Sequence, residues 1–391
     1  MSILKTQNIL MFAAIQDALG TPEYPVAADG LRMFEATFKV PPMRTLPSPE
    51  RTYDSYELHK ILSAGYDFSA LTMQVPIMPG IYPAFHGRQL LTAAMGVEDV
   101  DAPNHKYTYT QRKPSTAETF MTFACRFDTL CQWYLDTVCE SFDTPFKADA
   151  SKEGQFCMNF NFKALRHAFA GTDALKVAGV KDETHIEVYF PQRFTVDAVI
   201  RIDTDVTDYT ITAVDYVTGV IGISPKLLDN ELKDVAVFGY LPTPTPPVAD
   251  LIYMGNGFYK EDGSELGAME GTLNYSHPVN AYWEKFDTLF PTQLLRAGKV
   301  DAKINVKHFL MAENVDRLLW PRNKKQIEID IYAGSEDGDR FVNINAPVCE
   351  ALEAAEDNTP DDGGQVNMQY QCLGTSGGDA VSITVQCAPE A

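Results

Sequence analysis

Histidines are the first residues of this chain that could do chemistry, and their spacing does not support a metal site. Zinc sites in proteins use His and Cys ligands at short, regular separations. The seven histidines are instead scattered along the chain: His59, His86, His105, His167, His185, His277 and His308. Because His308 falls on an inward position of an alternating segment, we interpret it as a hydrogen-bonded structural residue.

Two acidic clusters and two glycine-rich turns also lack the pattern that their chemistry needs. Residues 203–208 and 336–339 do not match the twelve-residue calcium loop. Residues 255–257 and 374–378 lack the spacing and the strand-to-helix context of a phosphate-binding loop. Neither HExxH nor a nucleophile elbow occurs.

A pair of catalytic carboxylates, as used in glycoside hydrolysis, remains an alternative because the chain has 53 acidic residues, although no aromatic-lined groove can be inferred beside such a pair. We expect no enzyme, no cofactor and no metal, so the function must lie in surfaces.

The composition is that of an acidic globular protein. Asp and Glu number 53 against 32 Lys and Arg, which gives a net charge of −21. Such a surface repels nucleic acid and anionic membranes at long range, but DNA could still pass nearby without binding. No apolar run is long enough to span a bilayer, and residues 1–19 lack the pattern of a secretion signal, so we expect synthesis and folding in a cytoplasm. The seven cysteines include no CxxC pair, and we expect free buried thiols.

A strand followed by a short helix, at residues 67–96, is the element around which the chain is organised. Leu71, Met73 and Val75 alternate with polar residues, and Leu90, Leu91, Ala94 and Met95 then recur at helical spacing. The same order returns at residues 299–320. There Ala302, Ile304 and Val306 alternate, and Val315, Leu318 and Leu319 follow in a helical run that we expect to end before Pro321.

The neighbours of this unit repeat as well. Alternating segments at residues 34–40, 121–127 and 156–162 have counterparts at 272–275, 327–331 and 366–372. The offset between counterparts is nearly constant apart from one loop that is shorter in the second half. Four strands and a helix in the same order indicate a duplicated domain. The alternative is a single large β protein, because alternation is a low-information pattern.

Two long connections lie at the same place in the two halves, at residues 41–66 and 278–298. Loops of this length in compact domains are usually functional or disordered, and aromatic and charged residues favour a protein contact surface. The alternative is a loop packed against its own sheet. Our candidate contact residues between subunits or rings are Arg44, Arg51, Tyr53, Tyr56, Tyr282, Trp283 and Phe286.

The remaining segments complete a mainly β organisation. We divide the chain into an N-terminal arm (1–28) with a short helix over 11–19, a first domain (29–178), a small inserted all-β domain (179–242), a proline-rich linker (243–249) and a second domain (250–391). Residues 130–142 favour a strand, residues 149–154 a turn, and residues 381–385 a last strand. The acidic run 350–364 is expected on a solvated loop.

Four stretches carry a resemblance to a known family. GTPEYPVAADGLRMFEATFKV, ALTMQVPIMPGIYPAFHGRQLLTAAMG, YTYTQ and GQFCMNFNFKAL look like the major tail tube proteins of long-tailed, siphovirus-like bacteriophages. GTLNYSHPVNAYWE, GKVDAKINVKHFL and DGGQVNMQYQCLG are similar to the same fold again. The resemblance covers about 31–170 and 250–391, with the tube domain duplicated, and fixes no individual residue.

The resemblance implies a structural virion protein that acts as a subunit of the phage tail tube. Such proteins have a β-sandwich flanked by a helix and assemble into stacked rings whose inner sheets form one barrel. Three two-domain chains would then fill a pseudo-sixfold ring, with six chains as the alternative. An acidic lumen would let the genome slide through during ejection. The expected partners are other copies and the tape measure, terminator and distal tail proteins, first in the host cytoplasm and then in the virion.

Two other classes stay open. A multidomain β adhesin or carbohydrate-binding module would use the loop aromatics as a sugar platform. Another ring-forming tail component, such as a terminator or a baseplate protein, would form single rings that do not stack.

Overall fold

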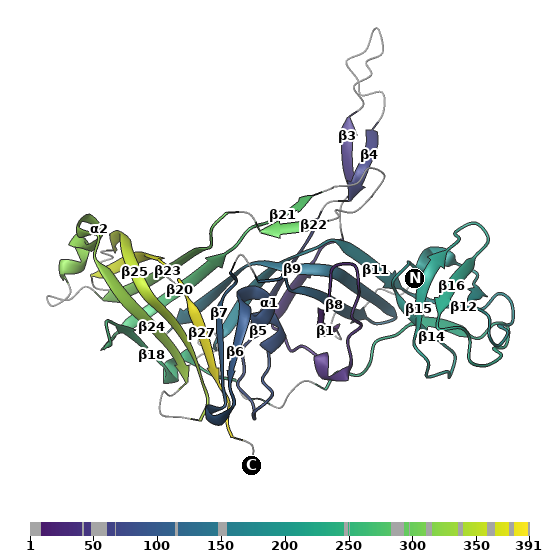
Figure 1. Cartoon of the computed structure of the whole chain (residues 1–391), viewed down its shortest axis with the longest axis horizontal. Helices are drawn as coiled ribbons and strands as arrows, with labels where there is room; N and C mark the ends of the chain where they lie inside the picture. Colours follow the sequence, from purple (N-terminus) through teal and green to yellow (C-terminus); the bar gives the residue numbers. More distant parts are fainter. Residues whose placement is uncertain are drawn as a thin grey trace, which may run out of the picture.

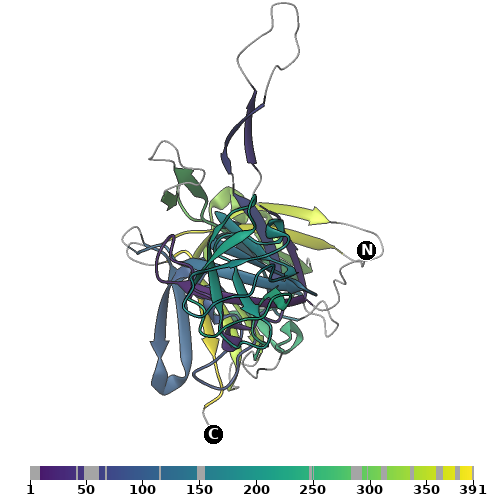
Figure 2. The same cartoon turned by 90° about the vertical axis from the view of Figure 1, so that its right-hand side faces the viewer.

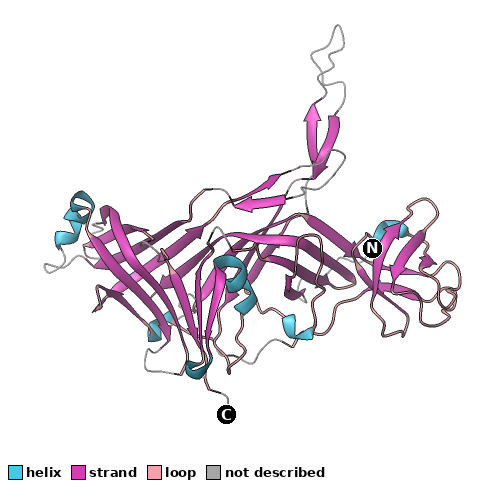
Figure 3. Cartoon of the chain, viewed as in Figure 1, coloured by secondary structure: helices cyan, strands magenta, loops and turns pink. Residues whose placement is uncertain are grey.

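The computed structural model is dominated by antiparallel strands with a few short helices, as Figure 3 shows, which confirms the predicted mainly β class. It describes residues 9–40, 43–47, 61–66, 68–113, 116–147, 155–245, 249, 251–282, 293–296, 298–309, 315–334, 339–357, 364–374 and 379–389.

Four strands of the first half form an antiparallel row. In spatial order they are β2 (Glu35–Phe38), β5 (Ser69–Pro76), β10 (Cys157–Ala164) and β9 (Leu130–Lys147). The alternation read from the sequence is the alternation of the structure: Leu71, Met73 and Val75 are buried, whereas Ala70 and Thr72 are exposed. Hydrophobic burial on one face therefore fixes the register of these strands.

Four strands of the second half pair in the same order. They are β20 (Ala268–Ser276), β23 (Asp301–Phe309), β26 (Gln365–Cys372) and β25 (Phe341–Asp357). The ladders share an irregularity, because the register shifts in β9 at Cys139/Ser141 and in β25 at Ala351/Glu353. A β-bulge at the same place in both halves lets us match them residue by residue. We call the two halves the first and second repeat.

A second layer is also built twice. β1 (Ile9–Gln16), β8 (Phe120–Phe127), the first part of β9 and β11 (Arg166–Ala170) pair in the first repeat. β18 (Phe258–Glu261), β24 (Gln326–Gly334), the first part of β25 and β27 (Ser382–Gln386) pair in the second. β19 (Ser264–Leu266) pairs with β18, while β6 (Gly96–Asp101) and β7 (Lys106–Gln111) extend the sheet beyond β27.

The two repeats are joined by direct strand pairing. Seven residues of β9, from Ser141 to Lys147, pair with β20 from Ser276 to Glu270. Eight strands thus form one continuous sheet, whose buried side shares one large core between the repeats. Figure 1 shows this sheet running through the middle of the molecule.

A short helical segment follows the second strand of each row. α1 (Arg88–Met95) buries Leu90, Leu91 and Met95, which confirms the expected helix. In the second repeat the 3-10 turn η7 (Val315–Leu319) continues into α2 (Trp320–Asn323). The expected end before Pro321 is wrong, because proline fits the first turn of a helix, where its missing N–H has no partner to lose.

Each long connection contains a two-stranded hairpin in its described part. The first has β3 (Met43–Pro47) and β4 (Ile61–Tyr66), and the second has β21 (Val279–Tyr282) and β22 (Gln293–Arg296). Figures 1 and 2 both show β3 and β4 projecting from the body, whereas Figure 1 draws β21 and β22 above β9.

The insertion forms its own six-stranded sheet, as its alternating segments predicted, and it shares its core with residues of the first repeat such as Phe12 and Trp133. Its strands are β12 (Thr172–Ala174), β13 (His185–Glu187), β14 (Val199–Ile202), β15 (Tyr209–Val214), β16 (Val220–Ser224) and β17 (Ala236–Gly239). Short 3-10 turns occur here and elsewhere: η2 (Ala27–Asp29), η3 (Ala102–Asn104), η5 (Pro191–Arg193) and η6 (Met254–Asn256). The domain limits that we set from the sequence stay a prediction.

Two further expectations were wrong. The helix over 11–19 is instead strand β1, because the run is buried on both sides: Met11 and Ala13 join the large core, and Phe12 joins the core of the insertion. A strand covered on both faces is apolar throughout, and such a run cannot be told from a helix by periodicity. The acidic run from 350 is not a loop up to residue 357, because pairing with β26 keeps it in β25.

Other expectations have mixed outcomes. Residues 130–142 are a strand, and the last strand is present as β27. All seven cysteines are buried with free thiols. The expected turn at 149–154 lies outside the described residues.

Candidate subunit interface and polar inner face

The eight-stranded sheet has one open edge at β2. The Lys39 N–H donates to the Ala70 carbonyl on β5. Because successive residues of an antiparallel strand point their backbone groups to opposite sides, Phe38 and Val40 direct theirs away from β5. Among the described residues no strand pairs with that side of β2. Free N–H and C=O groups of this kind are a template for another strand.

The other open edge belongs to the end of β25. From Glu353 to Asp357 this strand pairs with β26 on one side only, within the part of the chain that the structure describes. The matching part of β9 pairs with β10 on one side and with β20 on the other. In β25, the side that corresponds to the β20-facing side of β9 is therefore open. β20 is the first strand of the second repeat. The equivalent first strand in a neighbouring chain would be β2.

The register of such a contact follows from the contact inside the chain. One row of directly paired residues crosses the first repeat and enters the second: Ala36, Met73, Phe160, Phe142 and Tyr275. The matching row of the second repeat is Gly271, Val306, Met368 and Ala354. Gly271 in the second repeat matches Ala36 in the first. The first row reaches β20 at Tyr275, which is four residues after Gly271, so crossing one repeat shifts the row by four residues. In the same register, a pairing of β25 with β2 would bring Ala354 opposite Val40.

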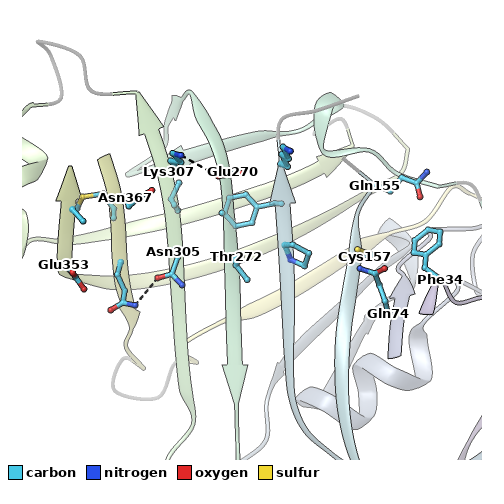
Figure 4. A pocket seen from close by; sticks show the side chains of 18 of the residues that line it. Phe34, Gln74, Gln155, Cys157, Glu270, Thr272, Asn305, Lys307, Glu353 and Asn367 are labelled. Carbon is cyan, nitrogen blue, oxygen red and sulfur yellow. Dashed lines mark hydrogen bonds and ion pairs between the residues drawn. The ribbon is translucent and has the colours of Figure 1, made fainter. Parts of the chain in front are cut away.

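One side of the eight-stranded sheet is polar across both repeats. Amide and hydroxyl side chains predominate there: Thr37, Thr72, Gln74, Asn159, Asn161, Ser141, Thr272, Asn274, Asn305, Asn367, Gln369 and Gln371. Several are linked directly, with Asn159 to Asp143 at 2.6 Å and Gln369 to Asn305 at 3.1 Å. Figure 4 shows this face near the junction of the repeats, where it is hollowed. The opposite side of the same strands is the apolar core.

Charges of both signs lie on the polar side, with a small excess of acidic residues. Among the described side chains of the eight strands and Lys39 beside them, seven are acidic and five are basic: Glu35, Glu140, Asp143, Glu270, Asp301, Glu350 and Glu353 against Lys39, Lys147, Lys163, Lys303 and Lys307. Lys307 lies 4.0 Å from Glu270 across the β20–β23 ladder. This face therefore carries only a small part of the net charge of −21.

A buried carboxylate distinguishes the second repeat from the first. Glu261 on β18 accepts hydrogen bonds from Arg317 at 2.7 Å, Tyr259 at 2.8 Å and Tyr370 at 3.3 Å. The Nε2 atom of His308 lies 3.5 Å from the Glu261 carboxylate. The Nδ1 atom of His308 donates a hydrogen bond to the Gly267 carbonyl at 3.2 Å. Burial, with the Glu261 charge beside it, raises the pKa of Tyr259 well above its usual range.

This cluster fastens η7 to the sheet. Arg317 and Glu261 are 3% and 5% exposed, so the pair is removed from water. In the first repeat the positions of Glu261, His308 and Tyr370 are held by apolar residues, namely Ala13, Val75 and Phe162. The hydrogen-bonded structural role predicted for His308 is confirmed.

The predicted contact residues are only partly placed. Arg44 lies on β3, and Tyr282 lies on β21 with its side chain 45% exposed. Five others lie outside the described residues: Arg51, Tyr53, Tyr56, Trp283 and Phe286. The sequence did not identify the open edges of β2 and β25, because an edge is defined by which strands fail to pair.

No group of three His, Cys, Asp or Glu side chains that could hold a metal ion occurs in the described part of the chain. Among the same residues, no helix is long and apolar enough to cross a membrane. No protein-family model matches this sequence, and no curated protein matches it.

Proposed function

We propose that this protein is a structural subunit of a bacteriophage tail tube, in which three chains close into a ring and rings stack into a conduit for the genome. The tail tube resemblance of the sequence suggests the role, and the sheet edges supply the physical reason for it. No catalytic step is part of the proposal.

The observation that carries the proposal is the strand contact between the repeats. β9 and β20 already form, inside one chain, the junction that a ring would repeat between chains. The free sides of β25 and β2 are the same two surfaces, one on each end of the sheet. A surface that is complementary to another surface of the same molecule generates a ring if the rotation closes. Closure would also remove both exposed edges.

The strand register supports a barrel. Crossing one repeat moves the row by four residues over four strands. With about 3.3 Å per residue along a strand and about 4.8 Å between strands, this stagger corresponds to a strand tilt of about 35°. Closed β barrels have tilts of this size. The stagger observed within the chain thus suits a closed barrel without further adjustment.

The number of chains follows from the width of the bore. At that tilt, three chains of eight strands give a backbone diameter of about 45 Å, and two chains give about 30 Å. A side-chain layer of about 5 Å on each wall leaves about 35 Å and about 20 Å. A DNA duplex, with grooves about 8 Å deep on either side of its base-pair centre, fits the wider bore freely and fills the narrower one. Three chains are therefore the smallest ring that suits a DNA conduit.

The polar face of the sheet would line this bore. We expected an acidic lumen from the whole-chain charge, and the seven acidic and five basic side chains on this face favour an amide-rich wall with a small excess of negative charge. A wall without excess positive charge cannot neutralise the DNA phosphates, so DNA would slide past it without specific binding. The acidic residues would then lie mainly on the outer surface.

Electron microscopy and mass measurement test the proposal together. Purified protein at increasing concentration should form hollow rings and then tubes, with a ring mass of three times 43.4 kDa per layer. Single rings that never stack would instead favour a terminator or baseplate component. A monomer at every concentration would overturn the proposal, and glycan binding by that monomer would support the adhesin class.

A further inference from the structure

One pair of cysteines in the second repeat lies face to face across two strands. Cys349 on β25 is directly paired with Cys372, the last residue of β26. The two sulfur atoms are 3.7 Å apart. Both side chains belong to the large core, where they are 0% and 4% exposed. The two thiols therefore contact each other directly, away from bulk solvent.

The backbone around this pair has the spacing that a disulfide needs. The N–H of Leu373 donates to the carbonyl of Val348 at 2.8 Å, so the ladder hydrogen bond lies beside the cysteines and they form a non-hydrogen-bonded pair. In such pairs the Cα atoms are about 4.5 Å apart, within the range of about 4.4 to 6.8 Å found in disulfides. Rotation of the two side chains is therefore enough to bring the sulfur atoms to bonding distance.

The other five cysteines lack such a partner. Cys125 and Cys131 lie on neighbouring strands, but their side chains enter different cores and point to opposite faces of the sheet. Cys139 and Cys157 pair with residues other than cysteine, and Cys387 follows the end of β27. Within the described part of the chain, the β25–β26 pair alone has the geometry of a disulfide.

The same site in the first repeat holds no thiol. The bulge and the ladders align Cys349 with Thr137 and Cys372 with Ala164. A local contact agrees with this match: the Thr137 hydroxyl donates to the carbonyl three residues earlier at 3.1 Å, and the Cys349 sulfur lies 3.7 Å from the corresponding carbonyl. Thr137 and Ala164 are also buried. The fold therefore accepts a threonine and an alanine at this site.

The cysteine pair sits where β25 passes from one layer to the other. Cys349 pairs with Ile327 of β24 in the second layer and with Cys372 of β26 in the eight-stranded sheet. The bulge follows after Ala351, and from Glu353 the strand pairs with β26 only, within the described residues. A covalent bond at Cys349 would thus fasten both layers next to the open edge of β25.

We propose that Cys349 and Cys372 are a modification site, at which a small-molecule disulfide such as oxidised glutathione closes an intrachain disulfide between β25 and β26. The bond concerns a single chain, so this inference does not depend on the proposed ring. In reducing surroundings the two thiols persist, and in oxidising surroundings the bond forms.

The reaction consists of two successive thiol–disulfide exchanges. The Cys372 thiolate attacks one sulfur of the small disulfide, so that a mixed disulfide forms and one small thiolate leaves. The Cys349 thiolate then attacks the Cys372 sulfur, the protein disulfide forms and the second small thiolate leaves. Each leaving thiolate takes up the proton that a cysteine has lost. The two cysteines are thereby oxidised, and the small disulfide is reduced to two thiols.

Exposure and acidity set the order and the rate of these steps. Cys372 reacts first because it ends β26 and is the more exposed of the two. The hydrogen bond with the Cys372 sulfur, together with burial, holds the pKa of Cys349 well above its usual range. Since the thiolate is the nucleophile, the exchange should take hours.

Thiol counting on the full-length protein tests the inference. After incubation with oxidised glutathione, the number of thiols that titrate in denaturant should fall from seven by two. The intact mass should fall by two hydrogen atoms, and peptide mapping should find Cys349 joined to Cys372. The matched control is Cys349→Thr/Cys372→Ala, which carries the residues of the first repeat at this site. The control should fold and lose none of its remaining thiols.

The bond should also stabilise the chain against unfolding. It closes a loop between residues 23 positions apart. The loss of chain entropy in the unfolded state should raise the ratio of folded to unfolded protein about a hundredfold. Urea titration of the oxidised protein should show this shift, a dithiol reductant should reverse it, and the control variant should show none.

Three results would overturn the inference. One is seven titratable thiols after incubation, also in urea just below the unfolding transition, where the end of β26 can open. The others are a glutathione adduct on Cys372 that is never displaced and a disulfide between other cysteines. None of these readouts requires assembly, so each outcome leaves the tube proposal to be judged by ring formation.

Discussion

Proline at position 40 should block ring closure without disturbing the chain itself. Val40 is 59% exposed, and the alternation set by the Lys39 to Ala70 hydrogen bond points its N–H away from β5. When β2 pairs with β25 in the register of the internal junction, that N–H meets Ala354 of the next chain. Val40→Pro removes the donor and leaves an acceptor of β25 without a partner, which costs about 1 to 3 kcal/mol per contact.

Three such contacts close each ring, so the effect multiplies. With about 2 kcal/mol lost at each of three contacts, and tenfold per 1.4 kcal/mol, the concentration for half-assembly of a trimer rises by about two orders of magnitude. Sedimentation velocity over a concentration series measures this shift directly. Val40→Thr is the matched control, because it keeps both the N–H and the β-branched side chain.

A folded Val40→Pro protein that forms rings at the concentration of the Val40→Thr control would refute the reasoning. Such a result would mean that the edge of β2 takes no part in the contact between chains.

Three further predictions concern the fold. Glu261→Gln leaves the buried charge of Arg317 without its partner and should lower the free energy of unfolding by about 3 to 5 kcal/mol in urea titrations. The double variant E261Q/R317M should recover most of this loss. Equal losses in the single and the double variant would argue against an ion pair. Gly271→Ala places a Cβ in steric overlap with the Phe146 ring at the β9–β20 junction and should cost about 1 to 3 kcal/mol, whereas Gly267→Ala, with nothing within 4 Å, should be nearly neutral in thermal melts. Burial lowers the pKa of His167 to about 4 in the folded protein, below its unfolded value of about 6.5. The free energy of unfolding should therefore fall as the pH drops from 6.5 to 4, by at most about 1.4 kcal/mol per pH unit. His167→Gln should flatten this slope, and an unchanged slope would assign the pH dependence to other groups.

Much of the fold could be predicted from the sequence because its strands are covered on one face only. Alternation then survives in the residue types, as in Leu71, Met73 and Val75 of β5, and a duplicated order of such segments is visible by inspection. β1 could not be predicted in this way, since Met11 and Phe12 are buried on opposite sides. Periodicity carries no information where both faces are covered.

The candidate interface was harder to predict. Arg44 and Tyr282 were chosen as loop residues of contact type, but the edges of β2 and β25 consist of backbone groups that no residue type marks. Their availability depends on pairings between distant segments, such as Phe142 with Tyr275. The cluster around Glu261 left only a faint signal, an acidic residue on an inward position two residues after Tyr259. The open edges and the Glu261 cluster therefore depend on nonlocal contacts, which the sequence pattern does not reveal.

A cryo-electron microscopy reconstruction of the assembled protein tests the central claim most directly. It should show three chains per ring, strands tilted by about 35° around a bore about 35 Å wide, and β2 of each chain beside β25 of the next with Val40 opposite Ala354. A ring whose chains meet through other surfaces, with both edges left open, would contradict the account.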